Sequence, residues 1–163
     1  WGRDATKVQG MIEDLRATED VQAWGLDIQA AETLDDLVSD CNLIVTTTSA
    51  KNPLIRADQV RKGMHITAMG SDDDGKQELE AALLAKADRV IADSISQCSQ
   101  YGECLHAIQG GLIEEGSILE LGQVIKNPAI GRTSEDQITV VDLTGVAVQD
   151  IQIAKMVDRA LQG

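Results

Sequence analysis

The sequence has very few aromatic residues, prolines and cysteines. Aromatic residues make up 2% of the 163 residues and phenylalanine is absent, so stacking on nucleic-acid bases has almost no side chains to use. The three cysteines are Cys41, Cys98 and Cys104, without a CxxC spacing, which disfavours a disulfide framework and predicts a reducing, cytoplasmic location. No apolar run approaches the roughly 20 residues that cross a bilayer, so we expect no membrane partner.

Acidic residues outnumber basic ones by 27 to 14, which gives a net charge of -13. Such a balance disfavours binding to phosphate backbones, so we expect no nucleic-acid partner. Hydrophobic residues at 43% and charged residues at 25% are typical of a globular chain. The two histidines, His65 and His106, form no metal-ligand spacing with any cysteine, so no metal site is predicted.

Short β-branched runs alternate with helical stretches along the chain. Strands are predicted at 42–48, 64–69, 89–92 and 138–143, with a short one at either 21–24 or 27–30. Helices are predicted at 5–15, 33–38, 79–87, 94–108 in two pieces, 117–125 and 145–162. This alternation is typical of βαβ units and predicts an α/β, Rossmann-like fold, with a mostly parallel sheet and helices on both faces. Residues 1–163 are expected to form one domain that includes the C-terminal helix 145–162.

Four segments follow predicted strands at the edge where an open parallel sheet binds its ligands; they are 46–49, 70–73, 93–94 and 144–146. The hydroxyls and backbone amides of Thr46, Thr47 and Thr48 could hold a phosphate, ribose or carboxamide, although threonine is also common in any strand. The acidic run 72–74 follows the next strand, and crowding of like charges can raise one pKa and create a proton-transfer group. A solvated acidic turn is the alternative; a calcium loop is disfavoured because its spaced ligands are missing.

Arg3 follows what reads as the end of a strand at the start of the chain. In a dinucleotide-binding sheet an acid near this place bonds the ribose 2′-hydroxyl, whereas an arginine suits a 2′-phosphate. Arg3 therefore favours NADP, and the adjacent Asp4 keeps NAD open. The glycine fingerprint GxGxxG is absent, so the residues alone indicate an α/β nucleotide-type domain with an acidic site at its strand ends.

Several separate motifs resemble those of the ornithine cyclodeaminase/mu-crystallin family, in order and with the same spacing. They are LIVTTT at 43–48, HITAMGSD at 65–72, GKQEL at 75–79, ELGQVI at 120–125, GRT at 131–133 and DLTGVAVQD at 142–150. GKQEL and the run GECLHA at 102–107 are most similar to the imino-acid reductase and ectoine-utilisation branches. The similarity runs from the first residue to the last.

The resemblance implies a Rossmann-type NAD(P) domain, a small-molecule imino or amino acid substrate, hydride transfer at the nitrogen-bearing carbon and a homo-oligomer. Asp72 matches the carboxylate that acts as acid and base, so it is the implied catalytic residue. The implied cofactor-binding residues lie on the nicotinamide side, except for Arg3 on the adenosine side. They are Arg3, Thr46, Thr47, Thr48, Met69, Gly70 and Val146.

Two departures from the family pattern bear on function. Asp73 and Asp74 stand where ornithine cyclodeaminases have Cys-Pro, which weakens the ornithine assignment. The family's N-terminal half is not represented, so we expect a sheet without its first strand and a chain that is inactive alone. Whether this chain is an enzyme stays open: an imino-acid reductase or amino-acid dehydrogenase is favoured, and a cyclodeaminase-type ammonia lyase and a non-catalytic NAD(P)-binding module are the alternatives.

Overall fold

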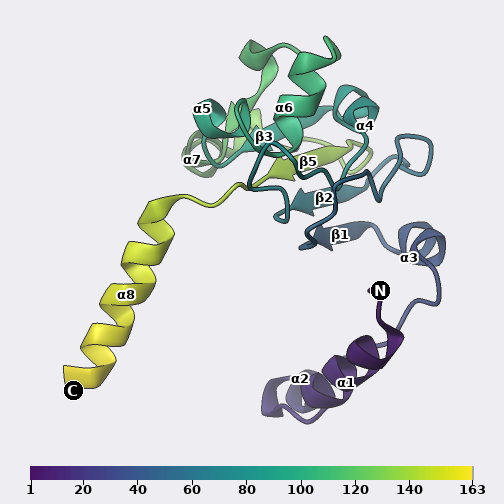
Figure 1. The fold of residues 1–163 in the computed structure, drawn as a ribbon, viewed down its shortest axis with the longest axis vertical. Helices are drawn as coiled ribbons and strands as arrows, with labels where there is room; N and C mark the ends of the chain where they lie inside the picture. The colour runs from purple at the N-terminus through teal and green to yellow at the C-terminus, as the bar shows by residue number, and fades with distance from the viewer. Residues whose placement is uncertain (163) are drawn as a thin grey trace. The chain divides into compact units, whose positions relative to one another are not determined.

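The computed structural model describes residues 1–162, which divide into two compact units at residue 41. The first unit is helical and contains α1 (Ala5–Arg16), α2 (Glu19–Trp24) and α3 (Leu34–Asp40) (Figure 1). The Asp4 carboxylate caps α1 by accepting a hydrogen bond of 3.1 Å from the backbone N–H of Lys7. The helices predicted at 5–15 and 33–38 are therefore confirmed.

The short strand predicted at 21–24 is wrong, because these residues belong to α2. Two acids in the first turn, Glu19 and Asp20, favour a helix start through the helix dipole. Gly25, with a φ of 61°, adopts the left-handed conformation that commonly ends a helix. The alternative strand at 27–30 is irregular in the structure. The six residues of α2 are too few for the spacing of apolar side chains to distinguish a strand from a helix.

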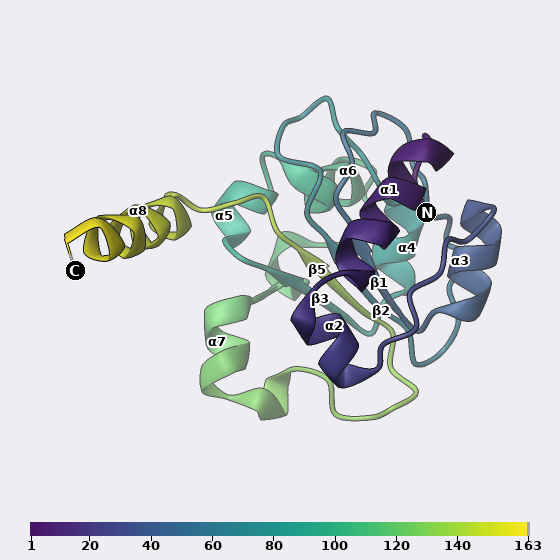
Figure 2. The same cartoon turned by 90° about the horizontal axis from the view of Figure 1, so that it is seen from below.

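The second unit contains a parallel five-stranded sheet with helices. Its elements are β1 (Leu43–Thr46), β2 (His65–Ala68), α4 (Ala81–Lys86), β3 (Arg89–Ala92), α5 (Ile95–Cys98), α6 (Gly102–Gln109), the 3-10 turn η1 (Glu115–Ser117), β4 (Leu119–Glu120), α7 (Leu121–Lys126), the 3-10 turn η2 (Pro128–Ile130), β5 (Thr139–Asp142) and α8 (Ala147–Gln162). The strand order is β1-β2-β5-β3-β4, and every pair is parallel. Figure 1 labels β1, β2, β5 and β3 in this order, and Figure 2 shows the same unit from below. The predicted α/β class is confirmed. The helix predicted at 117–125 is wrong in its first part, where β4 lies, and its second part is α7.

One face of the sheet forms the core of this unit. A single row of side chains crosses four neighbouring strands in register, and all of them are buried: Ile44, Ile66, Val140 and Val90. Helices α4 and α6 pack against each other, and α6 also packs against β5. The sheet is therefore held by apolar burial over its centre.

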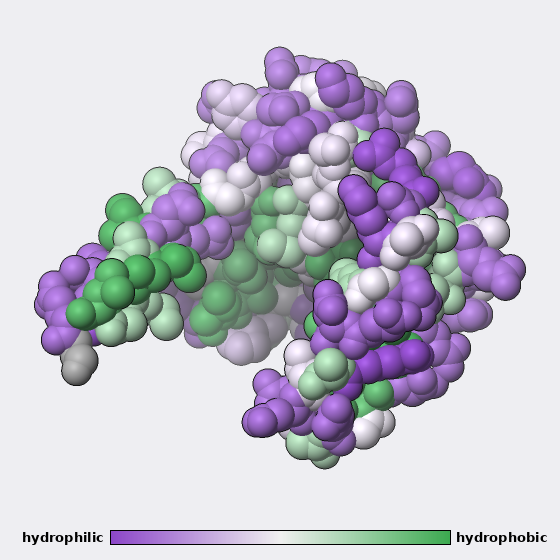
Figure 3. All heavy atoms as spheres, turned by 60° about the horizontal axis from the view of Figure 1, so that its bottom comes forward, coloured by the Kyte–Doolittle hydropathy of each residue, from purple (hydrophilic) through white to green (hydrophobic). Residues whose placement is uncertain are grey.

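The longest helix, α8, exposes all of its described residues. Figure 3 shows apolar side chains along it. The exposed large apolar residues of α8 are Val148, Ile151, Ile153, Met156, Val157 and Leu161. The predicted helix is confirmed, and its broad apolar side is uncovered. No helix within residues 1–162 combines the length and the hydropathy needed to cross a membrane.

Two buried carboxylates connect α6 to its surroundings, one to the segment before α4 and one to the sheet. Glu103, in the first turn of α6, accepts hydrogen bonds from the backbone N–H groups of Glu78 (2.7 Å) and Leu79 (3.0 Å). Asp142, the last residue of β5, accepts one from the N–H of Cys104 (2.9 Å). Burial raises the pKa of Glu103 to about 8 and that of Asp142 to about 6, against the opposing effect of these hydrogen bonds.

The raised pKa of Glu103 makes stability pH-dependent. The folded state holds this proton more tightly than the unfolded state, so the stabilisation is present below the ordinary pKa of 4.5 and is lost as pH rises to about 8. In the parent chain, the free energy of unfolding should fall by a few kcal/mol over this pH range, since one pKa unit corresponds to about 1.4 kcal/mol. We expect this fall to be absent in Glu103→Gln, because glutamine does not titrate. Denaturant unfolding at a series of pH values measures this.

The matched control is Glu115→Gln, which changes an exposed acid in η1. It should keep the pH dependence of the parent chain. Superimposable pH profiles for the parent and Glu103→Gln would contradict a proton-linked role for Glu103.

Candidate functional site

The carboxyl ends of the strands line up along one edge of the sheet. The pairing register places the final residues side by side in the order Thr46, Ala68, Asp142, Ala92 and Glu120. Because all five strands are parallel, the segments that follow them leave from the same edge. This is the edge where open α/β sheets bind ligands, and most of the predicted site residues lie on it.

The segment after β1 contains the three predicted threonines. Thr46 is buried, and its hydroxyl donates a hydrogen bond of 2.6 Å to Oε2 of Glu78. The backbone N–H of Thr48 donates to Oε1 of the same carboxylate at 2.5 Å. Thr47 is exposed, and its hydroxyl has no hydrogen-bond partner within the described part of the chain. Of the three threonines, Thr47 therefore presents a side-chain hydroxyl to solvent.

The segment after β2 is packed against the segment after β1. The N–H of Met69 donates to the carbonyl of Thr46 at 2.9 Å, and the N–H of Gly70 donates to Oε2 of Glu78 at 2.8 Å. A Cβ atom at Gly70 would lie 2.0 Å from the carbonyl oxygen of Thr48. Glycine is therefore required here because two backbone segments approach too closely for a side chain.

Glu78 joins these two segments, and sequence reasoning assigned it no role. Its side chain is fully buried. It stands within the GKQEL run, and the signal that could have revealed it was an acid beside the apolar Leu79 at the start of a helical stretch. A buried acid needs partners, and here they are the donors of Thr46, Thr48 and Gly70.

The predicted catalytic residue, Asp72, lies two residues beyond Gly70 and is exposed. It forms an ion pair with Lys76, which also lies 3.6 Å from a carboxylate oxygen of Asp73. The hydrogen bond from Lys76 holds the pKa of Asp72 below its ordinary value. The expectation that crowding of acids raises the pKa is wrong for Asp72, because the neighbouring ammonium outweighs the like charges.

The loop that carries Asp72 is anchored at both ends. The buried Ser71 hydroxyl donates a hydrogen bond of 2.8 Å to the carbonyl of Lys76, and Nε2 of His106 lies 2.8 Å from that same carbonyl oxygen. The N–H of Gly75 donates to a carboxylate oxygen of Asp73 at 2.8 Å. Asp72 is thus an exposed carboxylate on a loop whose backbone is fixed.

The ends of β5 and β3 are joined by Asp93. Its carboxylate accepts hydrogen bonds from the N–H of Ser94 (2.8 Å) and the N–H of Gly145 (3.1 Å). Gly145 has a φ of 80°, which places the following residue, the half-buried Val146, between the strand end and α8. Val146 therefore follows the same carboxyl edge as the threonines.

His65 lies at the opposite end of β2 from this edge. Its Nδ1 is 2.6 Å from the Thr139 hydroxyl, and burial, followed by the charge of Arg132, lowers its pKa. Within residues 1–162 no group of three or more histidine, cysteine, aspartate or glutamate side chains is arranged to hold a metal ion.

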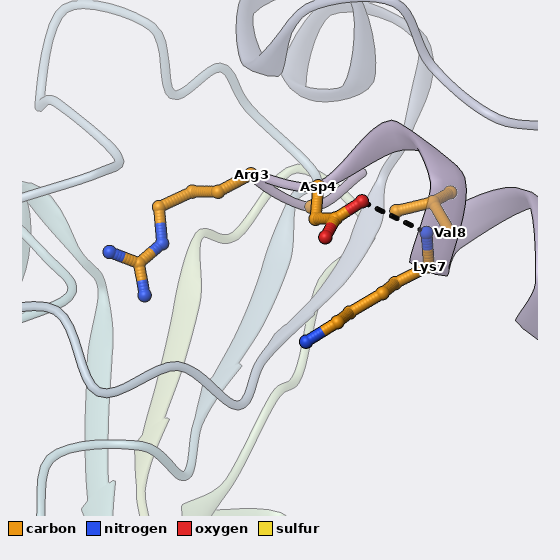
Figure 4. A pocket seen from close by; sticks show the side chains of 5 residues that line it. Arg3, Asp4, Lys7 and Val8 are labelled. Carbon is orange, nitrogen blue, oxygen red and sulfur yellow. Dashed lines mark hydrogen bonds between the residues drawn. The ribbon is translucent and has the colours of Figure 1, made fainter.

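Arg3 belongs to the first unit, where residues 1–3 form no strand. It lines a surface pocket of about 510 Å³ at the N-terminus of α1 with Gly2, Asp4, Lys7 and Val8. Figure 4 shows the Arg3 and Lys7 side chains extending from this turn, with Asp4 bonded to the backbone of Lys7. Among the described residues, neither side-chain cation has an ion-pair partner.

Three relatives of this chain are each about twice its length. A cyclodeaminase of Sinorhizobium fredii, named as uncharacterized, is 41% identical over 157 residues, which are 96% of this chain and 46% of that protein. The crystal structure of the iminosuccinate reductase of Paracoccus denitrificans in complex with NAD+ has 40% identity and a TM-score of 0.74, and the match covers 86% of this chain and 43% of that one. An archaeal alanine dehydrogenase dimer with bound NAD has 33% identity and a TM-score of 0.77, over 92% of this chain and 46% of that one.

The chain therefore spans less than half the length of each of these relatives. Their similarity in structure agrees with the parallel, Rossmann-like sheet described above. The model of the ornithine cyclodeaminase/mu-crystallin family matches residues 11–163. The chain belongs to the ornithine cyclodeaminase/mu-crystallin family.

Proposed function

We propose that this chain is the dinucleotide-binding part of an NAD(P)-dependent oxidoreductase that transfers hydride at the nitrogen-bearing carbon of an imino or amino acid. The observation that carries the proposal is the joined pair of strand ends, where Thr46, Thr48 and Gly70 bond one carboxylate just before the exposed Asp72. Relatives named iminosuccinate reductase and alanine dehydrogenase, each with NAD bound, support it.

The side chains at this edge suit a nicotinamide ring. The exposed Thr47 hydroxyl can bond a carboxamide, and Met69, with half of its side chain exposed, offers apolar surface to a ring face. Val146 offers a second apolar side chain at the same edge. The dinucleotide, when bound, supplies or accepts the hydride, and the protein binds and orients it. We therefore assign these residues to the nicotinamide side.

Asp72 would handle the proton that accompanies hydride transfer. Hydrogen bonding from Lys76 lowers its pKa, so Asp72 is held as a carboxylate at neutral pH. In the oxidative direction this carboxylate can accept a proton from the amino group as hydride leaves the neighbouring carbon, and then release that proton to solvent. In the reductive direction Asp72 first takes up a proton from solvent and passes it to the substrate nitrogen. Lys76 stabilises the carboxylate form of Asp72.

Changing Asp72 should separate proton transfer from cofactor binding. In a form of the protein extended to the length of its relatives, we expect Asp72→Asn to lower kcat for imine reduction at least about 100-fold, with NADH affinity unchanged. Asp74→Asn, two residues along the same exposed loop, should leave both unchanged. Equal losses in the two variants would point to general loop damage and contradict the assignment.

We further propose that the 163-residue chain alone is inactive, because it spans less than half of its relatives. Imine-dependent NADH oxidation, measured for this chain and for the extended form, should appear only in the extended form. Iminosuccinate and a cyclic pyrroline carboxylate are suitable substrates, since relatives are named for their reduction. Turnover by the 163-residue chain would refute this.

Two further measurements on the extended form test the alternative functions. Ammonia release from ornithine without net NADH consumption would favour a cyclodeaminase, as in the Sinorhizobium fredii relative's name. NADH binding without turnover in the extended form would favour a non-catalytic binding module.

We propose that Arg3 and Lys7 hold the adenosine ribose end and favour NADP. In support, both line one pocket, and neither has an ion-pair partner within residues 1–162. Arg3→Ser should weaken NADP binding at least about tenfold, the equivalent of roughly 1.4 kcal/mol, and leave NAD affinity within a factor of about two, because only NADP carries the 2′-phosphate. Lys155→Ser on the exposed α8 is the control. Calorimetric titration with both dinucleotides measures the ratio, and an unchanged ratio would contradict the preference.

We propose that residues 1–163 form one partial dinucleotide-binding domain, that the protein is cytoplasmic, and that it self-associates. The uncovered apolar side of α8 and an archaeal relative described as a dimer support self-association.

A further inference from the structure

We propose that Glu78 is a positioning residue that holds the nicotinamide-facing ends of β1 and β2 in their binding conformation. This inference rests on the function proposed above. Glu78 is fully buried, so it cannot touch a cofactor or substrate itself. It acts through the segments that it bonds.

The two carboxylate oxygens of Glu78 accept three hydrogen bonds from the segments at the ends of β1 and β2. Oε1 accepts from the N–H of Thr48, and Oε2 accepts from the hydroxyl of Thr46 and the N–H of Gly70. A carboxylate only accepts hydrogen bonds, so it matches a set made only of donors. Removing it would leave three polar groups without a buried acceptor. The backbone hydrogen bond from Met69 to Thr46 would still link the two segments.

Hydrogen bonds to its backbone carbonyl and from its backbone N–H hold Glu78 in place. Its carbonyl accepts hydrogen bonds from the N–H groups of Leu54 (2.7 Å) and Ile55 (3.1 Å). Its own N–H donates to the Glu103 carboxylate at the start of α6. The carboxylate therefore has a rigid support, which is what holding a binding site in one geometry requires.

The close approach at Gly70 makes this arrangement sensitive to small changes. Cδ of Glu78 would lie 2.6 Å from a Cβ at Gly70, and the Thr48 backbone is closer still. There is no room for a side chain between Gly70 and either group. The position of Met69, next to Gly70, is set by the same contacts, which links Glu78 to the apolar surface assigned to the nicotinamide ring.

The test uses the 163-residue chain, with NADH and ADP-ribose as paired probes, because ADP-ribose lacks the nicotinamide ring. We expect Glu78→Gln to weaken NADH binding at least about tenfold, because its amide N–H groups face donors, while ADP-ribose affinity stays within a factor of about two. The matched control is Glu80→Gln, which changes a neighbouring acid that accepts from the N–H of Ala57 (2.7 Å) and bonds neither strand end in the described chain. Titrations followed by NMR detect even millimolar affinities.

A second variant covers the case in which Glu78→Gln does not fold. Thr46→Val keeps the β-branched shape and deletes one donor to Glu78, so it should weaken NADH binding about threefold or more and spare ADP-ribose. Unchanged NADH binding in the folded variants, or equal losses for both probes, would overturn the positioning role. A parent chain that binds neither probe would instead overturn the proposed function, and this inference with it.

Discussion

One buried carboxylate joins the ends of two parallel strands, and the candidate site depends on that contact. Polar groups at the end of a buried strand must find hydrogen-bond partners without water. Glu78 provides those partners for the Thr46 hydroxyl and for two backbone N–H groups. The joined segments carry Thr47 and Met69 to the surface and lead directly to Asp72. A feature of the core therefore sets the geometry of residues that face solvent.

The same edge of the sheet is rich in negative charge that the structure compensates locally. Asp142 lies against the backbone N–H of Cys104 in the first turns of α6, and Asp93 accepts from the N–H of Gly145. Backbone donors thus stabilise these carboxylates in place of basic side chains. Asp72 differs, because its partner is the ammonium of Lys76. That difference separates the exposed Asp72, which we propose for proton transfer, from the half-buried Asp93 and the buried Asp142 at the strand ends.

Much of the fold could be predicted because β-branched runs and helical periods alternate clearly. The runs at Leu43–Thr46, His65–Ala68 and Thr139–Asp142 became parallel strands as expected. The prediction at 21–24 was wrong because a short apolar run does not distinguish strand from helix, and the acids before it and Gly25 after it decided the outcome. The burial of Glu78 depends on how the segments after β1 and β2 pack in three dimensions, which no local pattern records. The ion pair between Asp72 and Lys76 joins residues only four apart, and it depends on the conformation of that one loop. The roles of the predicted site residues remain predictions.

The central claim is that a dinucleotide lies across the carboxyl ends of β1 and β2. Backbone amide shifts of the isotope-labelled chain, recorded during titration with NADH, test it most directly. The account predicts the largest shift changes at Thr47, Thr48 and Gly70, with little change at Gly63 before the opposite end of β2. Changes concentrated around Gly63 and the amino ends of the strands, or spread evenly over the sheet, would contradict it.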